Sequence, residues 1–263
     1  MMRMKLSVNA STFTVPLRKA IEQSAAMGAE AVQIDVRNQL RPSEISGTGI
    51  RQLRHFLAER DLKIESTIFP LRHPLSEMER LDERVAALKA ALNWSHELGA
   101  EILAVRIGRI PDDSEDPGRI RLRDILNDLA SHGSRVGTTL CLTTGSESPL
   151  ALGEFLRGIT AGLLGLDCDP ATLVMNDQNQ SDWMTRLHER ILHVRVRDAI
   201  RDIDGIGQEV AFGEGQVNWT EFLDLLDQAS YQGWYTVDRT IGERRPVDLA
   251  RGMIGLRNLQ NSR

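Results

Sequence analysis

Cysteine is scarce in this sequence. The two cysteines, Cys141 and Cys168, form neither a CxxC pair nor a cluster with histidine. This fits a reduced, cytoplasmic protein better than a disulfide scaffold. The chain also lacks an apolar run long enough for a signal peptide or a membrane span, and its start, MMRMKLSVNASTF, is too polar for either. We therefore expect no membrane partner.

Basic residues are fewer than acidic residues, and linker-like stretches are absent as well. The chain has 32 Lys and Arg against 37 Asp and Glu, a formal net charge of −5. A nucleic-acid partner usually requires a basic footprint, so we expect none. No Ser/Gly/Pro-rich stretch divides the 263 residues, 41% of which are apolar. This length and composition predict a substantial core and a single domain over residues 1–263.

Eight short apolar runs recur along the chain, each followed by turn residues and an amphipathic stretch. Strands that alternate with helices form parallel sheets, and eight strands close a barrel, so the predicted fold class is α/β, a (β/α)8 TIM barrel. An open doubly wound sheet is the alternative, which is disfavoured because no glycine fingerprint follows the first run. The runs are Lys5–Ala10, Ala31–Arg37, Leu62–Phe69, Glu101–Gly108, Thr138–Thr144, Leu163–Asp169, Ile191–Asp198 and Gly233–Thr240.

Helix starts and ends can be predicted between several of these runs. Pro42 and Ser43 stand where a helix is expected to begin, and Gly99 where the next helix ends. Asn218 is a predicted N-cap, and that helix is expected to close at Gly233. The segment MNDQNQSDWMTRLHER, before the seventh run, has only a short helical pattern.

Polar side chains collect at the carboxyl ends of the runs, where barrels of this class build their sites. Arginine binds phosphate or carboxylate groups bidentately, and carboxylates accept from sugar hydroxyls or act as bases. The alternative is an internal Arg–Asp network that fills the mouth without a ligand. For His193, packing inside the barrel is favoured over catalysis. The catalytic candidates are Asp35, Glu65, Asp167, His193 and Asp238, and the substrate-binding candidates are Arg37, His73, Arg106, Thr143, Arg195 and Arg239.

The later segments LGLDCD, ILHVRVRDA and AFGEGQVNWTEFLDLLDQASYQGWYTVDR resemble the xylose-isomerase-like TIM barrels of the sugar phosphate isomerase/epimerase superfamily. FGEGQVNW, at Phe212–Trp219, is the most specific part, and MGAEAVQIDVR, at Met27–Arg37, is similar to an early strand of the family. The resemblance spans most of the chain in order and spacing. It implies an isomerase or epimerase that acts on a carbohydrate.

The resemblance also implies one divalent metal (Mn, Mg, Co or Zn) on Glu, Asp, His and Glu at the ends of the last four strands. Here only Asp167 matches: Thr143 and Arg195 replace Glu and His, and Asp238 replaces the last Glu. Arginine stays protonated and repels a cation. We expect no metal cofactor, with Asp167 and Asp238 as ligands only if one is retained. Arg195 is expected to form a salt bridge with Asp167 or Asp238 in the metal's place.

Two functional hypotheses follow. The first is an isomerase, epimerase or related lyase acting on a sugar, sugar phosphate or sugar acid. The second is a catalytically inactive, metal-free barrel that serves as a ligand-binding or regulatory protein. The apurinic endonuclease branch is set aside, because only His73 and His193 lie near the expected mouth and the net charge is negative. The expected partner is a small carbohydrate, and the resemblance makes a homo-oligomer possible.

Overall fold

The computed structural model describes residues 3–143 and 146–262. The predicted strand end at Thr144 therefore lies outside the described residues. Within them, no helix combines the length and apolarity needed to cross a membrane.

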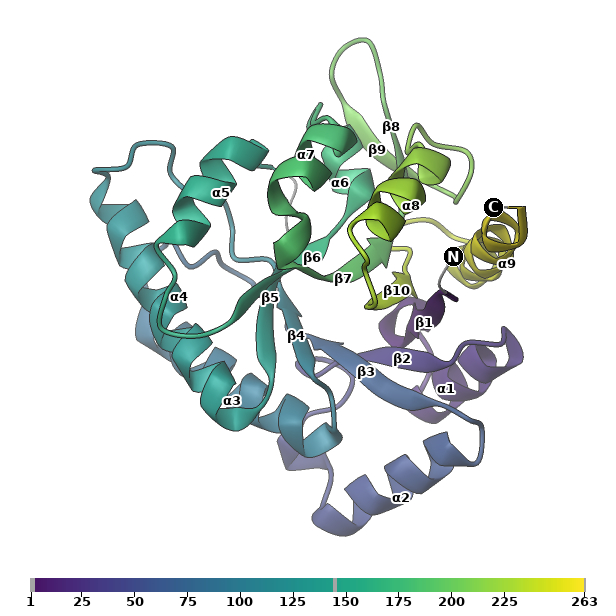
Figure 1. The fold of residues 1–263 in the computed structure, drawn as a ribbon. Helices are drawn as coiled ribbons and strands as arrows, with labels where there is room; N and C mark the ends of the chain where they lie inside the picture. The colour runs from purple at the N-terminus through teal and green to yellow at the C-terminus, as the bar shows by residue number, and fades with distance from the viewer. Residues whose placement is uncertain (1–2, 144–145, 263) are drawn as a thin grey trace.

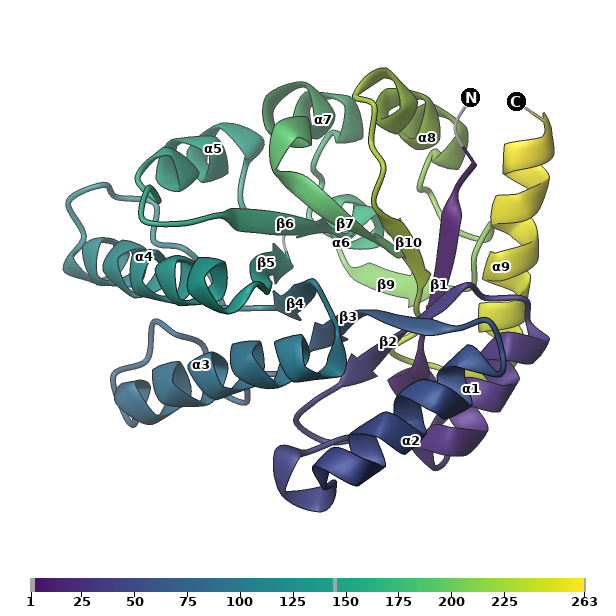
Figure 2. The ribbon, with the colours of Figure 1, turned by 60° about the horizontal axis from the view of Figure 1, so that its bottom comes forward.

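Eight parallel strands close into a barrel in the order β1-β10-β7-β6-β5-β4-β3-β2 (Figures 1 and 2). Each predicted apolar run contains one of them, and the (β/α)8 TIM barrel is confirmed. The runs are strongly apolar because the strands of a parallel barrel are covered on both faces. The strands are β1 Lys5–Asn9, β2 Ala31–Asp35, β3 Lys63–Ile68, β4 Ile102–Val105, β5 Thr139–Thr143, β6 Leu164–Cys168, β7 Ile191–Val196 and β10 Trp234–Val237.

Helices surround the barrel and bury its outer face (Figure 1). The helix before β7 is short, as its weak pattern predicted. Short 3-10 helices cover Ala10–Phe13, Pro42–Glu44 and His188–Arg190. The α-helices are α1 Leu17–Ala26, α2 Gly47–Ala58, α3 Leu81–Leu98, α4 Pro117–Val136, α5 Pro149–Arg157, α6 Pro170–Met175, α7 Gln180–Leu187, α8 Trp219–Gln228 and α9 Arg245–Ser262.

Helix ends follow local capping chemistry, and two of the predicted ends were wrong. Pro42 begins only a 3-10 turn, and α2 starts after Ser46, whose side chain accepts from the Gly49 amide. The predicted cap at Asn218 is present, since its side chain accepts from the Glu221 amide, but α8 ends at Gln228, well before Gly233. The predicted end of α3 at Gly99 is correct, and the positive φ of +85° there favours glycine.

A two-stranded antiparallel hairpin, β8 (Asp198–Arg201) with β9 (Gly207–Val210), follows β7 and was not predicted. The buried Asp198 carboxylate anchors its base by accepting from the amides of Gly213 and Val217. A Cβ atom at Gly215 would lie 1.9 Å from Asp198 Oδ1, so only glycine fits there. The FGEGQVNW segment is thus the base on which the hairpin is held.

Candidate functional site

The inner face of β7 carries three cationic side chains at increasing height in the barrel. Residues two apart on a strand point to the same side, so His193, Arg195 and Arg197 all face inward, while Val194 and Val196 face the helices. All three are buried: His193 is 0% exposed, and Arg195 and Arg197 are 8% exposed. The strand can be this polar because each of the three cationic side chains has a carboxylate partner inside the barrel.

His193 lies below the mouth, between two carboxylates. Its Nδ1 is 2.7 Å from Asp167 Oδ1, and its Nε2 is 2.8 Å from Thr236 Oγ1 and 3.4 Å from Glu65 Oε1. Burial by itself lowers the pKa of His193, but the charges of Glu65 and Asp167 outweigh burial and raise it to about 9. The imidazole is therefore a buried cation at neutral pH, paired with the carboxylates of Asp167 and Glu65.

Arg195 lies above His193 and joins two strand-end carboxylates. Its Nη2 is 3.0 Å from Asp167 Oδ2 and its Nη1 is 2.8 Å from Asp238 Oδ2, so the predicted salt bridge is present with both partners. Burial tends to raise the pKa of Asp167, but the charges of Arg195 and then His193 outweigh it and hold this pKa well below its usual range. The pKa of Asp238 is lowered as well, because Arg195 and then Arg197 outweigh the effect of burial.

Arg197, at the top of the same face, connects the barrel to the hairpin. Its guanidinium contacts Asp169 Oδ2 at 2.5 Å and Glu209 Oε2 at 3.1 Å, and it donates to Thr240 Oγ1 at 3.2 Å. Glu209 belongs to β9, so the hairpin supplies one of the two carboxylates that neutralise this arginine. Arg197 and Glu209 therefore hold the hairpin against the rim of the barrel.

A cavity of about 470 Å³ opens above these side chains and is referred to below as the mouth cavity. Guanidinium, hydroxyl and amide groups make up its polar lining, and among the residues that the structure describes no carboxylate takes part. Arg106 is its most open cation, with a side chain that is 52% exposed and 3.8 Å from Asp169 Oδ2. The lining residues are Ile68, Phe69, Pro70, Ala104, Arg106, Thr143, Thr172, Met175, Asn176, Arg195, Arg197 and Thr240.

Three of the predicted site residues, Arg106, Thr143 and Arg195, line the mouth cavity. Four others, Glu65, Asp167, His193 and Asp238, are brought together beneath it in the network of Arg195 and His193. Thr143 links the two levels, because its hydroxyl donates to Asp167 Oδ2 at 2.8 Å. For these seven residues the structure provides the proximity that a common site requires.

The remaining four predicted residues do not line the mouth cavity. Asp35 forms the turn after β2, where its Oδ1 accepts from the amides of Arg37 and Asn38. Arg239 pairs with Asp248 of α9 at 3.0 Å. Arg37 and His73 line a second pocket, next to α3, and not the mouth cavity. His73 fails to reach it because its ring is held at 2.9 Å by Glu77 of its own loop.

Several lining residues were missed at the sequence level. Arg197 had a usable signal, since it continues the parity of His193 and Arg195 on the same strand. Thr172 and Asn176 lie four residues apart after the end of β6, a spacing that puts both on one side of a helical turn. Thr240 lies beyond the end of β10 and had no distinguishing pattern.

The fold and the site define a (β/α)8 barrel whose polar centre lies at the carboxyl ends of the strands. Residues 21–258 match the family described as xylose isomerase-like TIM barrel, and the chain belongs to that family. No curated protein matches the sequence.

Solved structures with the same fold include a xylose isomerase domain protein from Planctomyces limnophilus, with a TM-score of 0.81 and 21% identity over 92% of this chain and 91% of that one. A xylose isomerase-like TIM barrel protein from Mycobacterium smegmatis, in complex with magnesium, has a TM-score of 0.77 and 16% identity over 99% of both chains. D-psicose 3-epimerase with D-tagatose from Clostridium cellulolyticum H10 has a TM-score of 0.78 and 13% identity over 98% of this chain and 99% of that one. At these identities the likeness concerns the fold.

The strand-end residues of this chain do not fit a divalent metal. Asp167 has both oxygens engaged, Oδ1 by His193 and Oδ2 by Thr143 and Arg195. Asp238 Oδ2 is bound by the same arginine. A guanidinium has no lone pair for a metal, and its charge repels a cation. Within residues 3–143 and 146–262, no three His, Cys, Asp or Glu side chains are grouped so that they could hold an ion.

Proposed function

We propose that this protein binds a small, polyhydroxylated, anionic carbohydrate, a sugar acid or a sugar phosphate, in the mouth cavity, without a divalent metal. The observation that carries the proposal is the division of charge by depth. Arg106, Arg195 and Arg197 line the cavity, whereas the carboxylates that neutralise Arg195 and Arg197 are buried, and none of them belongs to its lining. The nearest charges to a ligand are therefore positive.

The other polar groups of the cavity suit the hydroxyls of a carbohydrate. Thr143, Thr172 and Thr240 offer hydroxyl groups, and Asn176 offers an amide that both donates and accepts. Phe69 and Ile68 provide an apolar wall of the kind on which a sugar ring packs. The volume of about 470 Å³ lies within the range of small-molecule sites.

Binding has more support than proton transfer. A catalytic base needs an unengaged atom within reach of the substrate and a pKa near the working pH. Asp167 and Asp238 are ion-paired with Arg195, with pKa values below their usual range, and His193 is protonated beneath the cavity. We therefore favour the ligand-binding role over isomerase chemistry. We also propose that the protein is cytoplasmic, a setting in which the buried Cys141 and Cys168 stay free thiols.

The proposal predicts that Arg106→Ala weakens the binding of D-gluconate or glucose 6-phosphate by about ten- to a hundredfold. Among the described residues, Arg106 has two long contacts, at 3.4 Å to Thr172 Oγ1 and at 3.8 Å to Asp169, so its guanidinium is available to pair with the ligand anion. Isothermal titration calorimetry, with and without EDTA, measures the affinities. EDTA should leave them unchanged.

Arg109→Ala is the matched control, because Arg109 is 75% exposed, pairs with Asp112 and lies outside the mouth cavity. Its affinity should equal that of the unchanged protein. Glucitol, which has the hydroxyls of gluconate but no charge, should bind much more weakly than gluconate. The proposal fails if glucitol binds as tightly, if EDTA abolishes binding, or if Arg106→Ala and Arg109→Ala behave alike.

A further inference from the structure

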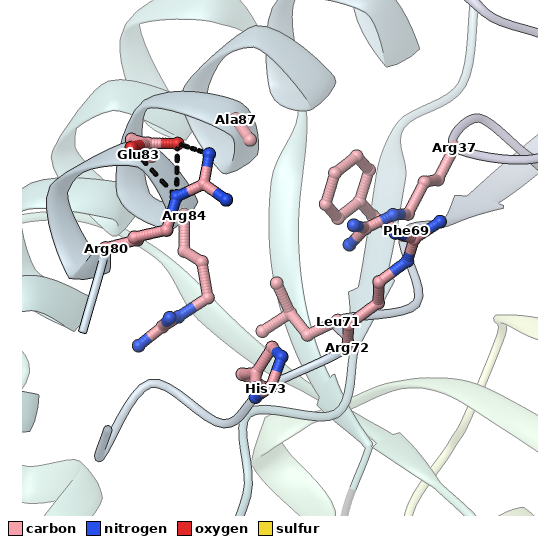
Figure 3. A pocket seen from close by; sticks show the side chains of 9 residues that line it. All are labelled: Arg37, Phe69, Leu71, Arg72, His73, Arg80, Glu83, Arg84 and Ala87. Carbon is pink, nitrogen blue, oxygen red and sulfur yellow. Dashed lines mark hydrogen bonds and ion pairs between the residues drawn. The ribbon is translucent and has the colours of Figure 1, made fainter. Parts of the chain in front are cut away.

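A second hollow, of about 290 Å³, lies outside the barrel mouth, between the loop after β3 and the first two turns of α3 (Figure 3). We call it the arginine pocket. Four arginines and one glutamate line it, which leaves a formal excess of three positive charges with His73 counted as neutral. The lining residues are Arg37, Phe69, Leu71, Arg72, His73, Arg80, Glu83, Arg84 and Ala87.

On one side of the arginine pocket, two arginines approach each other without an intervening carboxylate. Arg37 and Arg72 extend past Phe69 in Figure 3, with the Arg37 guanidinium carbon 5.1 Å from the ring centroid. Burial, and then the charge of Arg72, lower the pKa of Arg37 below its usual value. Arg72 makes no hydrogen bond or ion pair with any residue that the structure describes.

The opposite side of the arginine pocket is one face of α3. Glu83, Arg84 and Ala87 lie at helical spacing in the first two turns of α3, and Arg80 directly precedes the helix. Glu83 is engaged by Arg80 at 3.0 Å, and Arg84 donates to the backbone carbonyl of Glu79. Arg84 still has a buried Nε with no hydrogen-bond partner in the described part of the chain.

From this arrangement we propose that the arginine pocket is a binding site for a phosphoryl dianion; it shares Phe69 with the mouth cavity but none of that cavity's arginines. An excess of three positive charges suits a dianion better than a singly charged carboxylate. Arginine matches phosphate geometry bidentately, and Arg72 has its full donor fork available. The apolar surface of Phe69, Leu71 and Ala87 leaves room for a small organic group, so the dianion is either inorganic phosphate or the phosphate of a small monoester.

The test is calorimetric titration of the full chain with inorganic phosphate and with phenyl phosphate, in a phosphate-free buffer of low ionic strength. Arg72→Ala should weaken the binding of both probes by about ten- to a hundredfold. The variant should fold normally, because Arg72 is exposed and its side chain has no hydrogen bond to lose among the described residues. Phenyl phosphate binding tighter than inorganic phosphate identifies a monoester as the ligand, and equal binding identifies free phosphate.

Two control variants give the experiment its specificity. Arg135→Ala removes an exposed arginine at the end of α4 that lines neither cavity, and should bind phosphate like the unchanged protein. Arg106→Ala impairs only the mouth cavity, so the phosphate binding that depends on Arg72 should remain in this variant. If Arg106→Ala loses phosphate while Arg72→Ala keeps it, the anion binds in the mouth and the arginine pocket is refuted. If gluconate does not bind but Arg72→Ala loses phosphate, only the proposed function fails.

Discussion

Arg195→Ala is expected to lower the free energy of unfolding by about 3 to 5 kcal/mol. The substitution leaves two buried carboxylates, Asp167 and Asp238, without the guanidinium that lies 3.0 and 2.8 Å from them. Both are nearly inaccessible, at 0% and 1% side-chain exposure, so water does not replace the lost cation. Equilibrium unfolding in urea, with constant m-values, measures the loss.

A double-mutant cycle separates this charge effect from loss of packing. In an Asp238→Asn background one of the two carboxylates is already neutral, so Arg195→Ala should cost less there, with a coupling of about 1 to 3 kcal/mol. Arg195→Lys keeps the charge but not the fork that reaches both carboxylates, and should lose an intermediate amount. A coupling near zero, or a loss below about 1 kcal/mol for Arg195→Ala, would show that this guanidinium does not neutralise the pair.

The barrel could be predicted from the sequence because each parallel strand is buried on both faces and therefore appears as a compact apolar run. β7 is the instructive case: its inward parity of His193 and Arg195 was visible, and so was the expected bridge to Asp167 or Asp238. The parity depends on one strand, where a period of two fixes direction, and the bridge depends on the carboxyl ends of β6, β7 and β10 meeting at one mouth of the barrel. The helix starting after Ser46 was harder to place, since Pro42 is an equally good start signal.

The features of the site that could not be predicted depend on how the loops and the hairpin outside the barrel strands pack against the barrel and its helices. The hairpin has two four-residue strands of largely polar sequence, so no apolar alternation identifies it, yet it supplies Glu209 to Arg197. The position of His73 could not be predicted because it depends on the loop after β3, which turns toward α3. There Arg84 binds the carbonyl oxygens of Glu77 and Glu79. Such contacts between a side chain and a loop have no signature in the sequence.

The buried imidazole of His193 gives the second large effect, a loss of stability as the pH rises. In the folded protein the pKa of His193 is raised to about 9, against 6.5 for the exposed side chain, so the folded state holds a proton that the unfolded state releases. The resulting stabilisation is complete below pH 6.5 and is lost as the pH rises through about 9. It corresponds to about 3 kcal/mol between about pH 6 and 9.5.

Urea unfolding across this pH range should therefore show a steeper decline for the unchanged protein than for His193→Gln, which has no group to titrate at this position. Cys141 and Cys168 are buried thiols whose pKa values burial raises, and they too oppose folding at high pH. Both proteins contain them, so the difference in slope reports His193 alone. Nitrogen NMR of the unchanged protein gives an independent reading, with both ring nitrogens of His193 protonated at pH 7.5. A neutral ring at that pH, or parallel slopes, would mean that Glu65 and Asp167 do not hold a cation between them, and the charge network beneath the mouth cavity would have to be reassigned.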